Sequence, residues 1–165
     1  MVILVTGGVK SGKSSFALEL SRRYKKKAFI ATGVPFDEEM RNRINRHKSE
    51  RKGFDTFEEP VEVDKVIESL NGKYEFAILD CITTYLGNLY YYKKDIENYL
   101  EKFLKSIKKV DYTLVCVTNE VGWGIIPENK QVREYVERLG LLNKDIVKIA
   151  QKVYLMVSGI GVELK

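Results

Sequence analysis

The stretch VILVTGGVKSGKS, residues 2–14, decides the fold class of this chain. An apolar run leads into a loop of the form G-x-x-x-x-G-K-S, whose glycines let successive backbone N–H groups turn toward phosphate oxygens. Lys13 can reach the terminal phosphates, and Ser14 can offer its hydroxyl to Mg²⁺. The predicted phosphate contacts are Gly7, Gly8, Val9, Lys10, Ser11, Gly12, Lys13 and Ser14. The segment therefore predicts a nucleoside triphosphate site at the start of a helix.

Composition and charge favour a soluble globular protein over a nucleic-acid-binding or membrane-spanning one. The 165 residues suit one domain over residues 1–165, and 44% hydrophobic with 31% charged residues is typical of a soluble globular protein. The net charge of +5 suits an anionic ligand but is too diffuse to indicate nucleic acid. The first residues lack the basic region of a signal peptide, and no apolar run approaches the ~20 residues of a membrane span. We therefore expect a cytoplasmic location with no stable membrane insertion, and buried free thiols at Cys81 and Cys116.

Short apolar runs alternate with amphipathic segments along the chain. Strands are expected over residues 2–6, 28–31, 76–80, 113–118 and 153–157, with a hairpin partner over 161–164. Helices are expected over residues 13–26, 38–52, 63–70, 95–108 and 130–151, with Gly140 as a weak point in the last. The basic run over 22–27 is expected to close the first helix, where positive charge complements the helix dipole. The pattern predicts a three-layer α/β fold of the P-loop NTPase, RecA-like type: a mainly parallel sheet flanked by helices, with a C-terminal β-hairpin.

In such sheets ligands lie at the carboxyl ends of the strands, which draws attention to residues 32–33, 80–81, 118–120 and 158–159. Asp80 ends an apolar strand, as does the acidic residue that completes the Mg²⁺ site of a phosphate loop. A strand-ending aspartate is also a common turn residue. The phosphate loop upstream favours the metal-linked role.

His47 is the only histidine, in the polar segment RNRINRHKSER, residues 41–51. Four arginines and a lysine around it favour the neutral imidazole that a nucleophile must present. The residues alone leave two interpretations open, a covalent nucleophile and an uninvolved surface side chain.

The segment NEVGWGIIPEN, residues 119–129, follows an apolar strand and contains two glycines, a tryptophan and a proline. It is either a packed crossover turn, with Trp123 covering the core, or a wall of the substrate site. A GTPase switch would carry N-K-x-D here, and residues 118–121 supply neither the lysine nor the aspartate.

Several segments in order resemble the bifunctional adenosylcobinamide kinase/adenosylcobinamide-phosphate guanylyltransferase family of cobalamin assembly, over essentially the whole chain. They are residues 3–14, FIAT at 29–32, DEEM at 37–40, R-I-x-x-H at 43–47, T-x-E-E-P at 56–60, DCITT at 80–84, VTNEVG at 117–122, GIIPEN at 124–129 and VSGIG at 157–161. Arg46 stands beside His47 where some relatives carry a second histidine, so one histidine alone is available here.

The resemblance implies phosphorylation of adenosylcobinamide by ATP or GTP, followed by transfer of GMP from GTP to adenosylcobinamide phosphate. His47 stands at the position of the histidine that carries GMP, and Mg²⁺ and a homotrimer are implied. Residues implied to line the GTP site are Thr32, Gly33, Val34, Lys48, Ser49, Glu50, Arg51 and Glu58. The Glu58 carboxylate suits the guanine N1–H and N2–H₂ edge. The alternatives are a P-loop kinase of another small alcohol without guanylyl transfer, and a nucleotide-gated binding module without turnover.

Overall fold

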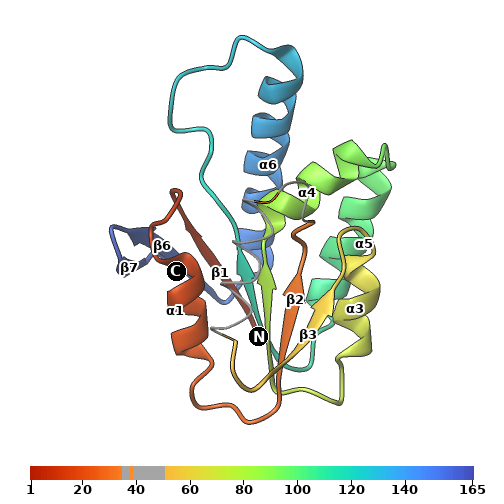
Figure 1. Ribbon diagram of the computed structural model, residues 1–165, viewed down its shortest axis with the longest axis vertical. Coiled ribbons are helices and arrows are strands. Elements are labelled where there is room, and N and C mark those ends of the chain that lie inside the picture. The colour runs from red at the N-terminus through yellow and green to blue at the C-terminus, as the bar shows by residue number, and fades with distance from the viewer. Residues whose placement is uncertain (35–37, 39–50) are drawn as a thin grey trace.

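The computed structural model describes residues 1–34, 38 and 51–165. Its centre is a seven-stranded sheet in the order β3-β2-β4-β5-β1-β6-β7 (Figure 1). The strands are β1 Val2–Gly7, β2 Lys27–Ala31, β3 Phe54–Glu58, β4 Phe76–Asp80, β5 Thr113–Val117, β6 Lys152–Val157 and β7 Ile160–Glu163. All neighbours pair in parallel except β6 and β7, which form the predicted antiparallel hairpin.

β1 lies at the point in the sheet where crossover connections run in opposite directions. The described helices are α1 Lys13–Leu20, α3 Val63–Ser69, α4 Ile82–Tyr91, α5 Ile96–Lys108 and α6 Lys130–Ile149. The chain leaves β1 toward β2, and later passes β1 in the opposite direction between β5 and β6. Because such crossovers are right-handed, α1 covers one face and α3 to α6 cover the other (Figure 1). In open parallel sheets ligands bind at such a point, which here is the carboxyl end of β1.

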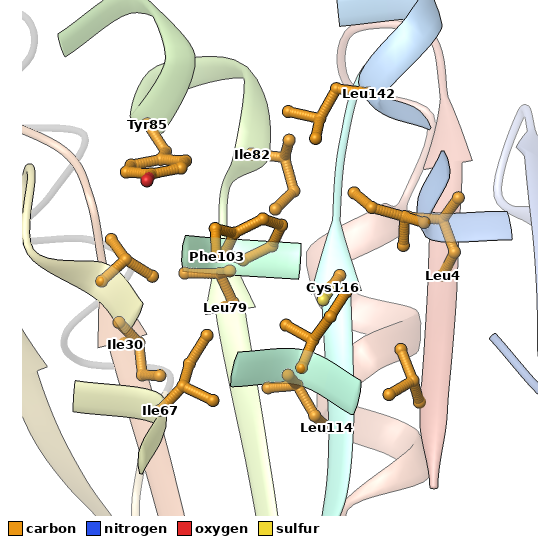
Figure 2. Packing of buried hydrophobic residues seen from close by; sticks show 14 of the residues in the cluster. Leu4, Ile30, Ile67, Leu79, Ile82, Tyr85, Phe103, Leu114, Cys116 and Leu142 are labelled. Atoms are coloured by element: carbon orange, nitrogen blue, oxygen red, sulfur yellow. The ribbon is translucent and has the colours of Figure 1, made fainter. Parts of the chain in front are cut away.

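Alternating side chains of the central strands supply the two cores. Leu4, Ile30, Leu79 and Leu114 point toward α3 to α6, where they pack with Ile67, Tyr85, Phe103 and Leu142 (Figure 2). Their sequence neighbours Ile3, Phe29, Ile78 and Val115 pack on the opposite face against Ala17 of α1. A strand buried on both faces carries a continuous apolar run, as the sequence showed for these four strands.

The three-layer architecture and the expected strands are confirmed, and α6 continues through Gly140 without a break. The end of the first helix was predicted wrongly, because α1 ends at Leu20 and not at residue 26. The Ser21 hydroxyl donates to the Leu18 carbonyl, and the N–H groups of Ser21 and Arg22 donate to carbonyls three residues back. These bonds compete with the helical pattern, so the basic run over 22–27 follows the helix and enters β2.

Two elements were missed by the sequence prediction, the edge strand β3 and the helix α4. Of the helix predicted over 38–52, residues 39–50 lie outside the described residues, while Arg51 and Lys52 are not helical. Both cysteines are free, with Cys116 buried and Cys81 partly buried. Among the helices that the structure describes, none has the length and apolar character needed to cross a membrane.

The core on the α3 to α6 face yields a test of stability. Phe103 is fully buried and its ring lies 5.5 Å from that of Tyr85, centroid to centroid. Phe103→Ala should lower the free energy of unfolding by about 3–5 kcal/mol, because it removes apolar contacts and leaves a cavity. The exposed Lys108→Ala on the same helix should change it by less than about 0.5 kcal/mol. Urea unfolding of both variants measures the difference; equal losses would contradict the assignment of this core.

Candidate nucleotide-binding site

The loop between β1 and α1 has a backbone that only glycine accepts at two positions. Gly7 has φ 146° and Gly12 has φ 99°. A Cβ atom on Gly7 would lie 2.5 Å from the Met156 carbonyl oxygen, and one on Gly12 would lie 3.2 Å from the Gly159 Cα. The Gly159 N–H donates to the Ser11 carbonyl at 3.0 Å. The loop is therefore packed against the turn of the β6–β7 hairpin.

Lys13 and Ser14 begin α1 and face the centre of the site. Lys13 is 8% exposed, and its ammonium donates to the Gly8 carbonyl at 2.5 Å. The Ser14 hydroxyl donates to Asp80 Oδ2 at 2.9 Å. No side chain caps the N-terminus of α1, and the positive end of a helix is suited to an anion.

Asp80 is the last residue of β4, and its pairing with Ser14 brings two oxygen ligands together. Hydroxyl and carboxylate oxygens are what Mg²⁺ prefers, and this ion commonly takes one or two protein ligands with the remainder from phosphates and water. Within the described ranges, no group of three or more His, Cys, Asp or Glu side chains could hold a metal. The Ser14–Asp80 pair fits a Mg²⁺ that arrives with its nucleotide.

Thr32 is buried and its hydroxyl binds protein groups. The hydroxyl donates to the Cys81 carbonyl and accepts from the Cys81 N–H, both at 2.9 Å. The Asn88 side chain donates to the carbonyls of Thr32 and Pro60, at 2.8 and 3.0 Å. These bonds fasten the carboxyl end of β2 to α4. Gly33 and Val34 follow as half-buried residues.

Glu58 and its neighbour Glu59 have different surroundings. Glu59 Oε1 accepts from the N–H groups of Val61 and Glu62 at 2.9 and 2.8 Å, so this carboxylate stabilises a turn. Glu58 ends β3 and is exposed, in register with Ala31, which is itself in register with Asp80. Glu58 is therefore the member of the pair that is accessible at the carboxyl edge.

Arg51 is the one residue of the predicted segment 48–51 that lies within the described residues. Its side chain is 9% exposed, and the guanidinium carbon lies 3.6 Å from the centroid of the Phe29 ring. Phe29 belongs to the core under α1, so Arg51 lies on the α1 side of β2. His47, Lys48, Ser49 and Glu50 lie outside the described residues, and the structure gives no geometry for the imidazole.

Cys81 follows Asp80 directly, which raises the question of a reactive thiol. Burial raises the pKa of this thiol, and the charge of Asp80 raises it further. Its sulfur accepts from the Thr84 N–H at 3.4 Å and caps α4. The thiol is therefore neutral and structural, since nucleophilic cysteines need a lowered pKa.

Glu120 is the residue for which sequence reasoning gave no role. Its Oε1 accepts from the Thr6 hydroxyl at 2.6 Å, and its N–H donates to the Gly7 carbonyl at 3.2 Å. Its place after a strand was visible in the sequence, but this contact joins residues 114 positions apart.

Trp123 lies in the same loop, and its side chain is 71% exposed. The interpretation of this loop as a packed turn in which Trp123 covers the core is therefore wrong.

The sequence matches the family described as cobinamide kinase/cobinamide phosphate guanyltransferase over residues 3–164. It is 34% identical over 181 aligned positions to the bifunctional adenosylcobalamin biosynthesis protein CobU of Escherichia coli K12, covering 100% of both chains. CobU of Salmonella typhimurium LT2 is similar to the same extent. CobP of Pseudomonas aeruginosa, also named a bifunctional adenosylcobalamin biosynthesis protein, is 30% identical over 98% of this chain and 96% of its own.

A solved KaiC-like protein from Pyrococcus horikoshii OT3 matches 93% of this chain and 71% of its own, with a TM-score of 0.50 and 15% identity. This likeness supports the RecA-like fold and nothing more specific. The family match covers the phosphate loop, the Ser14–Asp80 pair and the position of His47. The chain belongs to the cobinamide kinase/cobinamide phosphate guanyltransferase family.

Proposed function

We propose that this chain phosphorylates adenosylcobinamide and then transfers GMP from GTP to the product through a covalent intermediate on His47. One observation carries the proposal: a phosphate loop in which Lys13 is held at the Gly8 carbonyl and Ser14 is bound to Asp80, in a chain that matches the family over residues 3–164. In the first step a hydroxyl of adenosylcobinamide takes the γ-phosphoryl group of ATP or GTP.

In the second step the His47 imidazole attacks the α-phosphorus of GTP. A nitrogen–phosphorus bond forms and the bond to pyrophosphate breaks. A phosphate oxygen of adenosylcobinamide phosphate then attacks the same phosphorus, which releases the histidine and yields adenosyl-GDP-cobinamide. In this proposal the Lys13 ammonium, which donates to the Gly8 carbonyl, stabilises the departing pyrophosphate.

The remaining predicted contacts take different roles in this proposal. Gly33, Val34 and the segment 48–51 line the GTP site, and the exposed Glu58 accepts from the guanine edge. Thr32 acts as a positioning residue, since its hydroxyl is bound to the Cys81 backbone. Ser14 and Asp80 hold Mg²⁺, which neutralises phosphate charge when bound. The chain acts as a single domain in the cytoplasm.

The covalent step can be tested with GTP labelled at the α-phosphate. Purified protein with Mg²⁺ should acquire the label in an acid-labile, base-stable bond, because phosphoramidates on imidazole have these properties. His47→Ala should lose the label while binding GTP and giving an unchanged circular dichroism spectrum. A variant that still carries label would overturn the histidine assignment. Phosphoryl transfer to an alcohol without label in the parent protein would instead support a small-alcohol kinase, and nucleotide binding without turnover a binding module.

The metal assignment predicts a specific defect in Asp80→Asn. The amide keeps the size of the side chain but loses the charge that attracts Mg²⁺, so the concentration of Mg²⁺ giving half-maximal rate should rise by about tenfold or more. Asp145→Asn, whose carboxylate pairs with Lys148 on the surface of α6, is the matched control and should behave as the parent. An unchanged Mg²⁺ dependence in Asp80→Asn would remove Asp80 from the metal site.

We also infer a homotrimer, supported by the resemblance and by large apolar side chains left exposed on the loop after β5 and on the hairpin. These are Val121, Trp123, Ile125, Ile126, Val157, Ile160 and Val162. Light scattering after gel filtration should give a mass near three times the 19.0 kDa of one chain. A mass equal to one chain at micromolar concentration would contradict the trimer.

A further inference from the structure

Glu120 is hydrogen-bonded to the phosphate loop, next to the carbonyl that holds Lys13. β5 lies between β1 and β4 in the sheet, so a residue just after β5 lies between the loop and Asp80. The Glu120 N–H donates to the Gly7 carbonyl, and the Lys13 ammonium donates to the next carbonyl, that of Gly8. Two consecutive carbonyls of the loop thus bind Glu120, which carries a carboxylate, and Lys13, which is expected at the γ-phosphate.

The carboxylate of Glu120 is oriented and keeps one oxygen available. Oε1 accepts from the Thr6 hydroxyl at 2.6 Å, and Thr6 is 5% exposed at the end of β1. Oε2 accepts no hydrogen bond from the described residues, and in the same part of the chain Glu120 forms no ion pair. A half-buried carboxylate with one fixed oxygen and one available oxygen is suited to accept a proton.

Phosphorylation of an alcohol needs such an acceptor, because the hydroxyl must lose its proton as it attacks. Asp80 is bound to Ser14, and His47 is assigned to the second step. We propose that Glu120 is the general base of the kinase step, an inference that rests on the proposed function. The substrate oxygen forms a bond to the γ-phosphorus, the bond from that phosphorus to the nucleoside diphosphate breaks, and the hydroxyl proton passes to the Glu120 carboxylate.

Guanylyl transfer does not require this base. A neutral imidazole attacks the α-phosphorus through a lone pair and has no proton to give up first. The acceptor of GMP is a phosphate oxygen that is already anionic near neutral pH. Loss of Glu120 should therefore separate two activities that share one phosphate loop.

The variant Glu120→Gln tests this separation, because its carbonyl oxygen still accepts from Thr6 but cannot take a proton. The kcat for phosphorylation of adenosylcobinamide should fall by about 10²–10⁴-fold, the range of a lost general base. The KM values for nucleotide and adenosylcobinamide should stay near those of the parent. Labelling of His47 by α-labelled GTP, and GMP transfer to supplied adenosylcobinamide phosphate, should proceed at the parent's rates.

Thr6→Val is the matched control, since it removes the hydrogen bond to Oε1 but leaves the carboxylate. Its kcat for phosphorylation should fall by less than about tenfold, the loss of an orienting contact and not of the base. Full kinase activity in Glu120→Gln would overturn the proposal, as would an equal loss of kinase and labelling. A Thr6→Val variant as impaired as Glu120→Gln would also overturn it. A parent protein without kinase activity on adenosylcobinamide would instead overturn the proposed function.

Discussion

The packing of the phosphate loop against the β6–β7 hairpin is the constraint on which the site depends. Gly12 approaches Gly159 so closely that a Cβ atom would lie 3.2 Å from its Cα, and the Gly159 N–H holds the Ser11 carbonyl. On the same side, the ring of Phe16 in α1 lies 4.9 Å from that of Tyr154 in β6, centroid to centroid. These contacts hold the loop and the first turn of α1 against the sheet. A loop held by contacts within the protein loses less conformational freedom when a ligand binds.

A second set of hydrogen bonds holds the carboxyl ends of β2 and β4. The Thr32 hydroxyl binds both backbone groups of Cys81, and Asn88 joins the end of β2 to the segment before α3. Because Cys81 follows Asp80 directly, these bonds, which are buried or partly buried, also hold the end of β4 that carries Asp80. Buried hydrogen bonds of this type are costly to leave unmade, so the network stabilises one arrangement of the edge.

The sequence predicted correctly those elements whose structure is determined by residues close together in the chain. The phosphate loop, the central strands and the long amphipathic helices are encoded in short patterns, and the structure has them. The helix α4 was missed because residues 82–91 combine β-branched and aromatic side chains with Gly87, and it forms because Tyr85, Leu86 and Leu89 are buried in the core. The short strand β3 carries Asp, Thr and Glu, and pairs with β2 across a long stretch of chain. Tertiary contacts outweighed local propensity in both cases.

Dependence on tertiary contacts also explains why the sequence indicated a role for His47 and none for Glu120. A single histidine among cations is visible as composition, whereas a carboxylate becomes a candidate base only through its neighbours. Those neighbours, Thr6 and Gly7, lie on a strand far away in sequence and beside it in the sheet. A loop that binds triphosphate does not by itself determine which phosphorus is attacked. The phosphorus that is attacked depends on which nucleophile reaches the triphosphate. The acid–base groups around the loop determine which nucleophiles are activated. One phosphate site can thus serve two reactions when an alcohol approaches from the side of Glu120 and an imidazole supplies its own lone pair.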